Sequence, residues 1–199
     1  MTRKVAALGS LLAVAVLVWV VTLASSGGQR PTLEGASFRT AREPDWWLTT
    51  WIGPRGDYRY QLGSTRAAIN GLRVPPAGAA AITIDEAPRS LAATPPAAGG
   101  ARSALPSTAR PVALLPSIAG VPRGARDVTQ TPPRTIELGG TEAGEESFAY
   151  TYQGHANLQV DILGARRGPV VLVELDAEPA PAAQGKAALE ALIRSWAWR

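Results

Sequence analysis

The sequence contains no cysteine, one histidine and only two lysines, Lys4 and Lys186, among its 199 residues. The absence of cysteine excludes disulfide bonds, thiolate metal sites, a thiol nucleophile and a lipid anchor attached to cysteine. Packing alone must therefore hold the fold together. With one histidine, a metal site would depend on carboxylates, and neither a twelve-residue calcium loop nor a phosphate-binding glycine loop is present. We expect no metal and no cofactor.

The basic charge is small and spread along the chain. The formal net charge is +4, and Arg3 and Lys4 contribute to it beside the first apolar run. A nucleic-acid-binding protein needs basic residues clustered on one face to replace phosphate counterions. We therefore expect no nucleic acid as a partner. The abundance of alanine, glycine and proline, with so little lysine, is typical of a GC-rich genome.

The first long apolar run predicts a membrane anchor. Val5 to Ala24 carries no charge, and at about 1.5 Å per residue a helix of this length matches the roughly 30 Å hydrocarbon core of a bilayer. Arg3 and Lys4 place the N-terminus in the cytoplasm by the positive-inside rule. The alternative is a cleaved signal peptide ending at Ala24. Either alternative predicts that the rest of the chain is extracytoplasmic, and we favour a single-pass anchor in the cell membrane.

The remaining residues are enough for one ordinary domain. We assign residues 1–28 to the anchor and residues 29–43, which are polar and glycine-bearing, to a juxtamembrane linker. Residues 44–199 form the predicted extracytoplasmic domain. Within it, residues 87–133 are rich in proline and alanine and are interpreted as a partly disordered insertion, with a short helical turn near residues 112–118.

Aromatic residues cluster where the domain begins. The cluster consists of Trp46, Trp47, Trp51, Tyr58 and Tyr60. Tyr58 and Tyr60 alternate with Arg59, as in a half-buried strand, and we predict a strand or hairpin over residues 46–62. The spacing of Trp47 and Trp51 leaves a short helix open. These five residues are our candidate surface for a ligand or partner, and burial in the core is the competing interpretation.

The last third of the chain predicts a sheet and a helix. Phe148, Tyr150 and Tyr152 share one strand face, and apolar residues at 158, 160 and 162 share a face of the next. The nearly continuous apolar run at 170–175 predicts a central strand covered on both sides. After a break at residues 178–184, the spacing over residues 186–196 predicts a helix whose apolar stripe includes Trp196 and packs on the sheet. Trp198 is expected to seal the end of the core.

The ending GPVVLVELDAEP followed by ALEALIRSWAWR resembles the last strand and C-terminal helix of the PsbP-like fold group, which includes the LpqN-type lipoproteins of mycobacteria. Gly139 and Gly140 occupy the place of the glycine-marked entry to the strands, and Ser195 and Trp196 that of the aromatic helix end. The resemblance covers residues 135–199. It implies an α+β sandwich used for binding or assembly, usually without enzyme activity. The chain departs from the pattern because it lacks the lipobox cysteine.

His155, in the turn QGHAN, is the residue on which a catalytic alternative depends. A hydrolase would need a nucleophile and an acid that converge on it, and no serine lies in a nucleophile-elbow glycine pattern. We interpret His155 as a turn residue in water and name no catalytic residue. Two groups of acids, one at 142, 145 and 146 and the other at 174, 176 and 178, are interpreted as solvated strand ends.

These expectations combine into an α+β fold: an N-terminal transmembrane helix, then an antiparallel sheet packed against a C-terminal helix. The expected function is that of a membrane-anchored, extracytoplasmic binding or accessory module of the bacterial cell envelope, without catalysis. Its partners would be the membrane and a protein or lipid-like ligand. The alternatives are a cell-envelope hydrolase that uses His155 and a structural subunit of a membrane complex.

Overall fold

A computed structural model describes residues 31–53, 56–69, 74–88, 110–166 and 168–199. The predicted anchor at residues 1–28 and most of the stretch at 87–109 lie outside these ranges. Within them, neither helix has the length and apolar character that crossing a bilayer requires. The described part is α+β, with antiparallel sheets packed against two helices.

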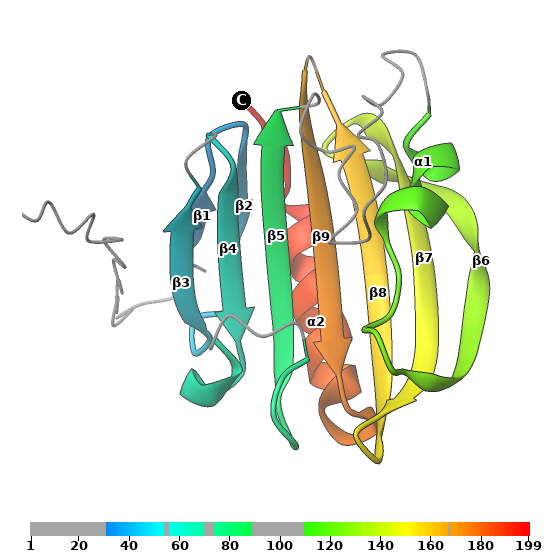
Figure 1. Cartoon of the computed structure of the whole chain (residues 1–199). Helices are drawn as coiled ribbons and strands as arrows, with labels where there is room; N and C mark the ends of the chain where they lie inside the picture. Colours follow the sequence, from blue (N-terminus) through cyan, green and yellow to red (C-terminus); the bar gives the residue numbers. More distant parts are fainter. Residues whose placement is uncertain (1–30, 54–55, 70–73, 89–109, 167) are drawn as a thin grey trace, which may run out of the picture.

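A 7-stranded antiparallel sheet forms the body of the molecule, in the order β3-β4-β5-β9-β8-β7-β6 (Figure 1). Its strands are β3 (Trp47–Ile52), β4 (Tyr58–Gly63), β5 (Ala80–Pro88), β6 (Arg126–Leu138), β7 (Thr141–Tyr152), β8 (His155–Ala165) and β9 (Pro169–Ala177). A short 3₁₀ turn, η1 (Arg66–Ala68), follows β4. The predicted hairpin at 46–62 is confirmed and its helical alternative is wrong. The predicted meander is also confirmed, with β9 at the centre of the sheet.

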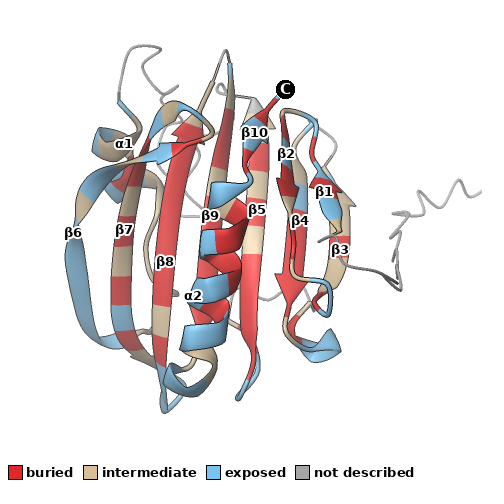
Figure 2. Cartoon of the chain, turned by 180° about the vertical axis from the view of Figure 1, so that it is seen from behind, coloured by how far each residue is buried: buried red, intermediate tan, exposed pale blue. Residues whose placement is uncertain are grey.

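A second layer covers one face of this sheet. It consists of α2 (Pro179–Arg194) and a 3-stranded sheet of β1 (Thr32–Glu34), β2 (Phe38–Ala41) and β10 (Ala197–Trp198). Seen from behind, these elements lie in front of the strands (Figure 2). The sequence predicts a linker at residues 29–43, and the structure corrects this. Leu33, Phe38 and Thr40 are buried while their neighbours face outward, so both strands add to the core.

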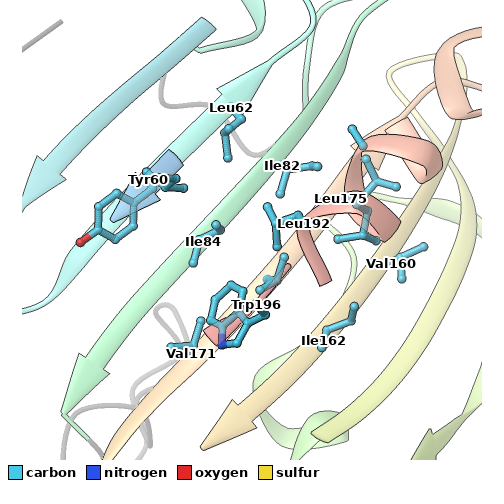
Figure 3. Close-up of a cluster of buried hydrophobic side chains, with 14 of the residues drawn as sticks. Tyr60, Leu62, Ile82, Ile84, Val160, Ile162, Val171, Leu175, Leu192 and Trp196 are labelled. Atoms are coloured by element: carbon cyan, nitrogen blue, oxygen red, sulfur yellow. The ribbon is translucent and has the colours of Figure 1, made fainter. Parts of the chain in front are cut away.

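The main core lies between the two layers. It is built from aliphatic side chains of β4, β5, β8 and β9 and from the inward face of α2, as Figure 3 shows for Leu62, Ile82, Ile84, Val160, Ile162, Leu175 and Leu192. At one end an aromatic group joins β2 to the C-terminus. Phe38 stacks on Trp196 with ring centroids 4.3 Å apart and meets Tyr60 edge-on at 5.5 Å.

The closing tryptophans are buried, as the sequence predicted, but Trp196 is not part of the helix, because α2 ends at Arg194. Trp196 and Trp198 are both buried, and the indole N–H of Trp198 donates to the Leu138 carbonyl oxygen at 2.8 Å. Gly139 makes this contact fit, since it has φ of 57° and an added Cβ would come within 2.8 Å of the Trp196 ring. The last residues of the chain are therefore tied to the β6–β7 turn.

Helix α2 begins earlier than predicted. We expected residues 178–184 to break the pattern, but the helix begins at Pro179. Proline is tolerated in the first turn because the N–H groups there have no partner within the helix. Gly185, one turn further, brings α2 close to the sheet: an added Cβ would lie 2.9 Å from Leu175.

The opposite face of the sheet is covered in part by α1 (Pro111–Ile118). Leu115 on this helix packs against Leu163 and Val170. The helical turn predicted near 112–118 is confirmed. The insertion was predicted to extend to residue 133, but β6 already begins at Arg126. Proline is tolerated there because β6 is an edge strand.

Candidate functional site

The structure divides the five aromatic residues that the sequence singled out. Trp46 and Tyr60 are each only 5% exposed and belong to the main core. They cannot form part of a surface, and the competing interpretation, burial, holds for them. Trp47, Trp51 and Tyr58 remain partly exposed.

The three exposed aromatics lie around the β3–β4 hairpin. In its register Trp51 is opposite Arg59 and Ile52 is opposite Tyr58. Because neighbouring residues of a strand point to opposite faces, Trp51 and Tyr58 lie on different sides of the sheet. The guanidinium of Arg66 covers the ring of Trp47 at 5.8 Å, in cation–π geometry. The ring of Trp47 is therefore already covered by Arg66, whereas Trp51 and Tyr58 border open space.

Two hollows meet at Tyr58. The larger, of about 520 Å³, is lined by Trp51, Ile52, Gly53, Asp57, Tyr58, Arg59, Asp85, Glu86 and Ala87. The second, of about 430 Å³, is lined by Ala36, Gly56, Tyr58, Glu86, Ala87, Gly168 and Pro169. They share Tyr58, Glu86 and Ala87, and together we call them the hairpin groove. The groove runs from the edge of the sheet at Trp51 to the turn before β9.

Charged groups line part of the hairpin groove. Arg59 forms a bidentate ion pair with Asp85, with N–O distances of 2.6 and 2.8 Å. Both side chains are well exposed, so the pair contributes little to stability but fixes the two side chains. Glu86 is buried and accepts the Ala36 N–H at 3.0 Å. Burial, followed by the charge of Glu86, raises the pKa of Tyr60 to about 12. The groove thus combines aromatic walls with a fixed carboxylate.

His155 lies at the other end of the molecule, at the start of β8. Its Nδ1 is 2.9 Å from Glu178 Oε1, and the other oxygen of Glu178 accepts the Gly78 N–H at 2.8 Å. The pair borders a hollow of about 380 Å³ whose other described lining residues are Val74, Pro75, Pro76, Ala77, Pro122, Tyr152, Gln153 and Asn157. None of these is a serine, threonine or cysteine. The histidine has an orienting acid but no such nucleophile among these residues.

Glu174 and Asp176, which the sequence analysis took for solvated strand ends, are buried next to Asp161. Asp161 is opposite Glu174 in the register of β8 and β9, and Asp176 follows on the same face. Burial raises the pKa of Asp176 well above its ordinary value, and Glu174 and Asp161 raise it further. The Tyr150 hydroxyl donates to Asp176 at 2.9 Å, and the Gln159 amide donates to both oxygens of Asp161 at 2.9 and 2.8 Å.

The expectation of solvation is therefore wrong for Glu174 and Asp176, and also for Glu146, which is buried on β7. The signal was available in the strand period: Glu174 and Asp176 alternate with Val173 and Leu175 in a strand predicted to be covered on both faces. Among the residues that the structure describes, no group of three or more His, Cys, Asp or Glu side chains could hold a metal ion.

No family model and no curated protein matches the chain. Among solved structures, the chain is similar to LpqN, which is involved in cell envelope biogenesis of Mycobacterium tuberculosis, with 11% sequence identity and a TM-score of 0.44 over 85% of this chain and 90% of that chain. It is also similar to PA94, a protein of unknown function from Pseudomonas aeruginosa, with 13% identity and a TM-score of 0.40 over 82% of this chain and 92% of that chain. The resemblance to LpqN concerns the fold and extends over most of the chain.

Proposed function

We propose that this protein is a membrane-anchored, extracytoplasmic binding or accessory module of the bacterial cell envelope and that it carries out no catalysis. In this proposal Val5–Ala24 supplies the anchor, and the folded residues from Pro31 onward present the hairpin groove to a protein or lipid-like partner.

The observation that carries the proposal is the hairpin groove. Trp51 and Tyr58 border open hollows of about 520 and 430 Å³. Trp46 and Tyr60, from the same stretch of sequence, are buried in the core instead. A concave surface with aromatic walls and a few fixed polar groups is the usual form of a binding site. Aromatic side chains give a large contact area at a small entropic cost, which favours this end of the sheet as the place where a partner binds.

The rival function is that of a hydrolase that uses His155. The contact between His155 and Glu178 favours it, because an acid of this kind orients the histidine in a catalytic triad. The described lining of the adjoining hollow, however, offers no serine, threonine or cysteine to be activated. We therefore keep binding as the proposed function.

A photo-crosslinking experiment on the full chain in cell membranes tests the proposal. Tyr58 is replaced by p-benzoylphenylalanine, and the matched control carries the same group at Val128, which is 46% exposed on β6. We expect an adduct with a specific protein or lipid from position 58 and none from position 128. Equal labelling at the two positions, or no adduct at position 58, would contradict the proposal. Loss of an envelope hydrolase activity in His155→Ala would favour the rival.

A further inference from the structure

The sheet ends in an open strand at β3. Among the described strands, β3 pairs with β4 alone, and both views show it as the outermost described strand on its side of the molecule (Figures 1 and 2). Its register runs from Trp47 opposite Gly63 to Ile52 opposite Tyr58 without a shift. Ile52, at its end, is 67% exposed. A regular strand with an unpaired side is a template for another strand.

The hydrogen bonds of the hairpin show which backbone groups face outward. The Gly53 N–H donates to the Asp57 carbonyl at 2.8 Å, and these residues continue the β3–β4 register. Because hydrogen-bonded and non-hydrogen-bonded pairs alternate in an antiparallel ladder, the N–H and C=O groups of Leu48, Thr50 and Ile52 point away from β4. The other side of β4 agrees: Ser64 N–H bonds the Ala80 carbonyl at 2.9 Å, so the residues of β4 opposite these three face β5.

The edge carries none of the usual features that prevent strand addition. From Trp46 to Gly53 there is no charged side chain and no proline. Edge strands are normally protected by lysine, by proline or by a bulge. All side chains of β3 are uncharged, and every residue keeps its backbone N–H. An added strand would therefore meet neither charge repulsion nor a missing hydrogen-bond donor.

We propose that β3 pairs in antiparallel fashion with β3 of a second copy of this chain, around a two-fold axis that passes midway between the two Thr50 residues. Residues opposite each other across such an axis must lie on the same face of the sheet. Thr50 is then opposite Thr50, and Leu48 of each copy is opposite Ile52 of the other. The three residues with outward backbone groups are the ones that exchange hydrogen bonds, and the exposed Ile52 gains an apolar neighbour.

The chemistry of the strand favours a second copy as the partner. A strand without charge causes no repulsion when it is paired with itself, and threonines opposite each other are a favourable cross-strand pair. A register centred on Thr49 would place Ile52 opposite the buried Trp46 and is less favourable. The pairing joins the two main sheets into one continuous sheet.

The position of Pro31 fits this symmetry. Thirty residues precede it, and it leads into β1, which lies on the α2 side of the main sheet. An axis perpendicular to the sheet keeps that side the same in both copies, so Pro31 of each copy lies on the same side of the pair. Two anchored chains could therefore pair within one membrane; this point rests on the proposed anchor, whereas the strand pairing does not.

Disulfide trapping in membranes tests the pairing, because the full chain has no cysteine of its own. Thr50→Cys places two thiols opposite each other at a Cα separation of about 5.5 Å, within the range of disulfides. The matched control is Thr131→Cys on β6, an exposed threonine on the other edge of the sheet. We expect oxidation to give a covalent dimer of Thr50→Cys and only a background of random collisions for Thr131→Cys.

A second pair of variants protects the test against misfolding. Ile52→Lys and Val128→Lys each replace an exposed apolar residue, one on each edge. In the Thr50→Cys background, Ile52→Lys should lower the dimer yield about tenfold, because it places two ammonium groups against apolar partners, and Val128→Lys should leave it unchanged. Equal yields at positions 50 and 131, no effect of Ile52→Lys, or a different protein bound to the introduced thiol at position 50 would overturn the proposal. Sedimentation of the same samples with the membrane fraction reports separately on the anchor.

Discussion

The two edges of the main sheet are built in opposite ways. β6 is long and exposed, but Pro132 and Pro133 remove donors from it, and its register with β7 shifts twice. Asp127 adds a residue with φ of 53°. β3 is half as long, regular and without charge. The comparison shows that exposure alone does not make an edge available: β6 has more free length, yet β3 has the geometry that another strand can use.

The two edges also differ in what lies behind them. The β3 side is backed by β1, β2 and β10 through the aromatic contacts of Phe38 with Tyr60 and Trp196. On the β6 side, Arg134 forms an exposed ion pair with Glu145 at 2.6 Å, which adds little stability. The open edge therefore rests on buried aromatic contacts, whereas the β6 side is backed by α1.

The largest expected effect comes from removing that base. Trp196→Ala should lower the free energy of unfolding by about 3 to 5 kcal/mol, because it leaves a cavity beside Phe38. Hydrogen exchange of the variant should accelerate in β3 and β4 more than in β6. Leu163→Ala, under α1, is the control for the other half. If both variants accelerated exchange equally in β3 and β6, the packing behind the two edge strands would not stabilise them differently.

A smaller effect concerns the acids at the centre of the sheet, which separate the two edges. The pKa of Asp176 is raised in the folded state, mainly by burial and then by Glu174. The favourable contribution of this group is therefore complete below its unfolded pKa and is lost as the pH rises through the folded pKa.

Asp176→Asn should accordingly be more stable than the unmodified chain at neutral pH, and its advantage should vanish toward pH 4. Thermal unfolding between pH 4 and pH 8 measures this difference. A variant that is less stable at neutral pH would show that the Tyr150 hydrogen bond to Asp176 outweighs desolvation. Exchange at β3 and β6 should slow together if the sheet unfolds as one unit.

The smallest effect on stability is expected when a proline, which β6 already contains, is introduced at an outward-facing position of β3. Thr50→Pro removes a donor that faces away from β4 and should change the free energy of unfolding by only about 1 kcal/mol or less, although the lost N–H belongs to the proposed pairing between two β3 strands. Thr49→Pro removes a donor that bonds β4 and should cost clearly more. Chemical denaturation compares the two variants. A larger loss for Thr50→Pro would reverse the assignment of inward and outward backbone groups.

The sequence was sufficient where one pattern decided the structure. The alternation around Phe148 and Val160 predicted β7 and β8, and the spacing of Ala188, Leu189 and Leu192 predicted the buried stripe of α2. These segments are long enough for periodicity to dominate. The structure leaves Trp51 and Tyr58 partly exposed beside the hairpin groove, and their role as a surface for a partner stays a prediction.

The sequence was insufficient where long-range pairing decided the structure. Leu33 and Phe38 stand in a polar stretch that has too few apolar residues to reveal strands, and they become strands because β10 and the core lie beside them. Trp46 and Trp51 cannot be told apart as core and surface until the hairpin is placed in the sheet. Glu174 and Asp176 appeared solvated because charge suggested a strand end, whereas β9 is central.

Residue-level hydrogen exchange of the full chain in membranes tests the central claim most directly. The account predicts that the amides of Leu48, Thr50 and Ile52 become protected as the protein density in the membrane rises, while the amides of Trp47, Thr49 and Trp51, which bond β4, stay protected at all densities. The free amides of β6 should exchange rapidly throughout. If Leu48, Thr50 and Ile52 exchanged rapidly at every density, β3 would be an unused edge and the account would be wrong.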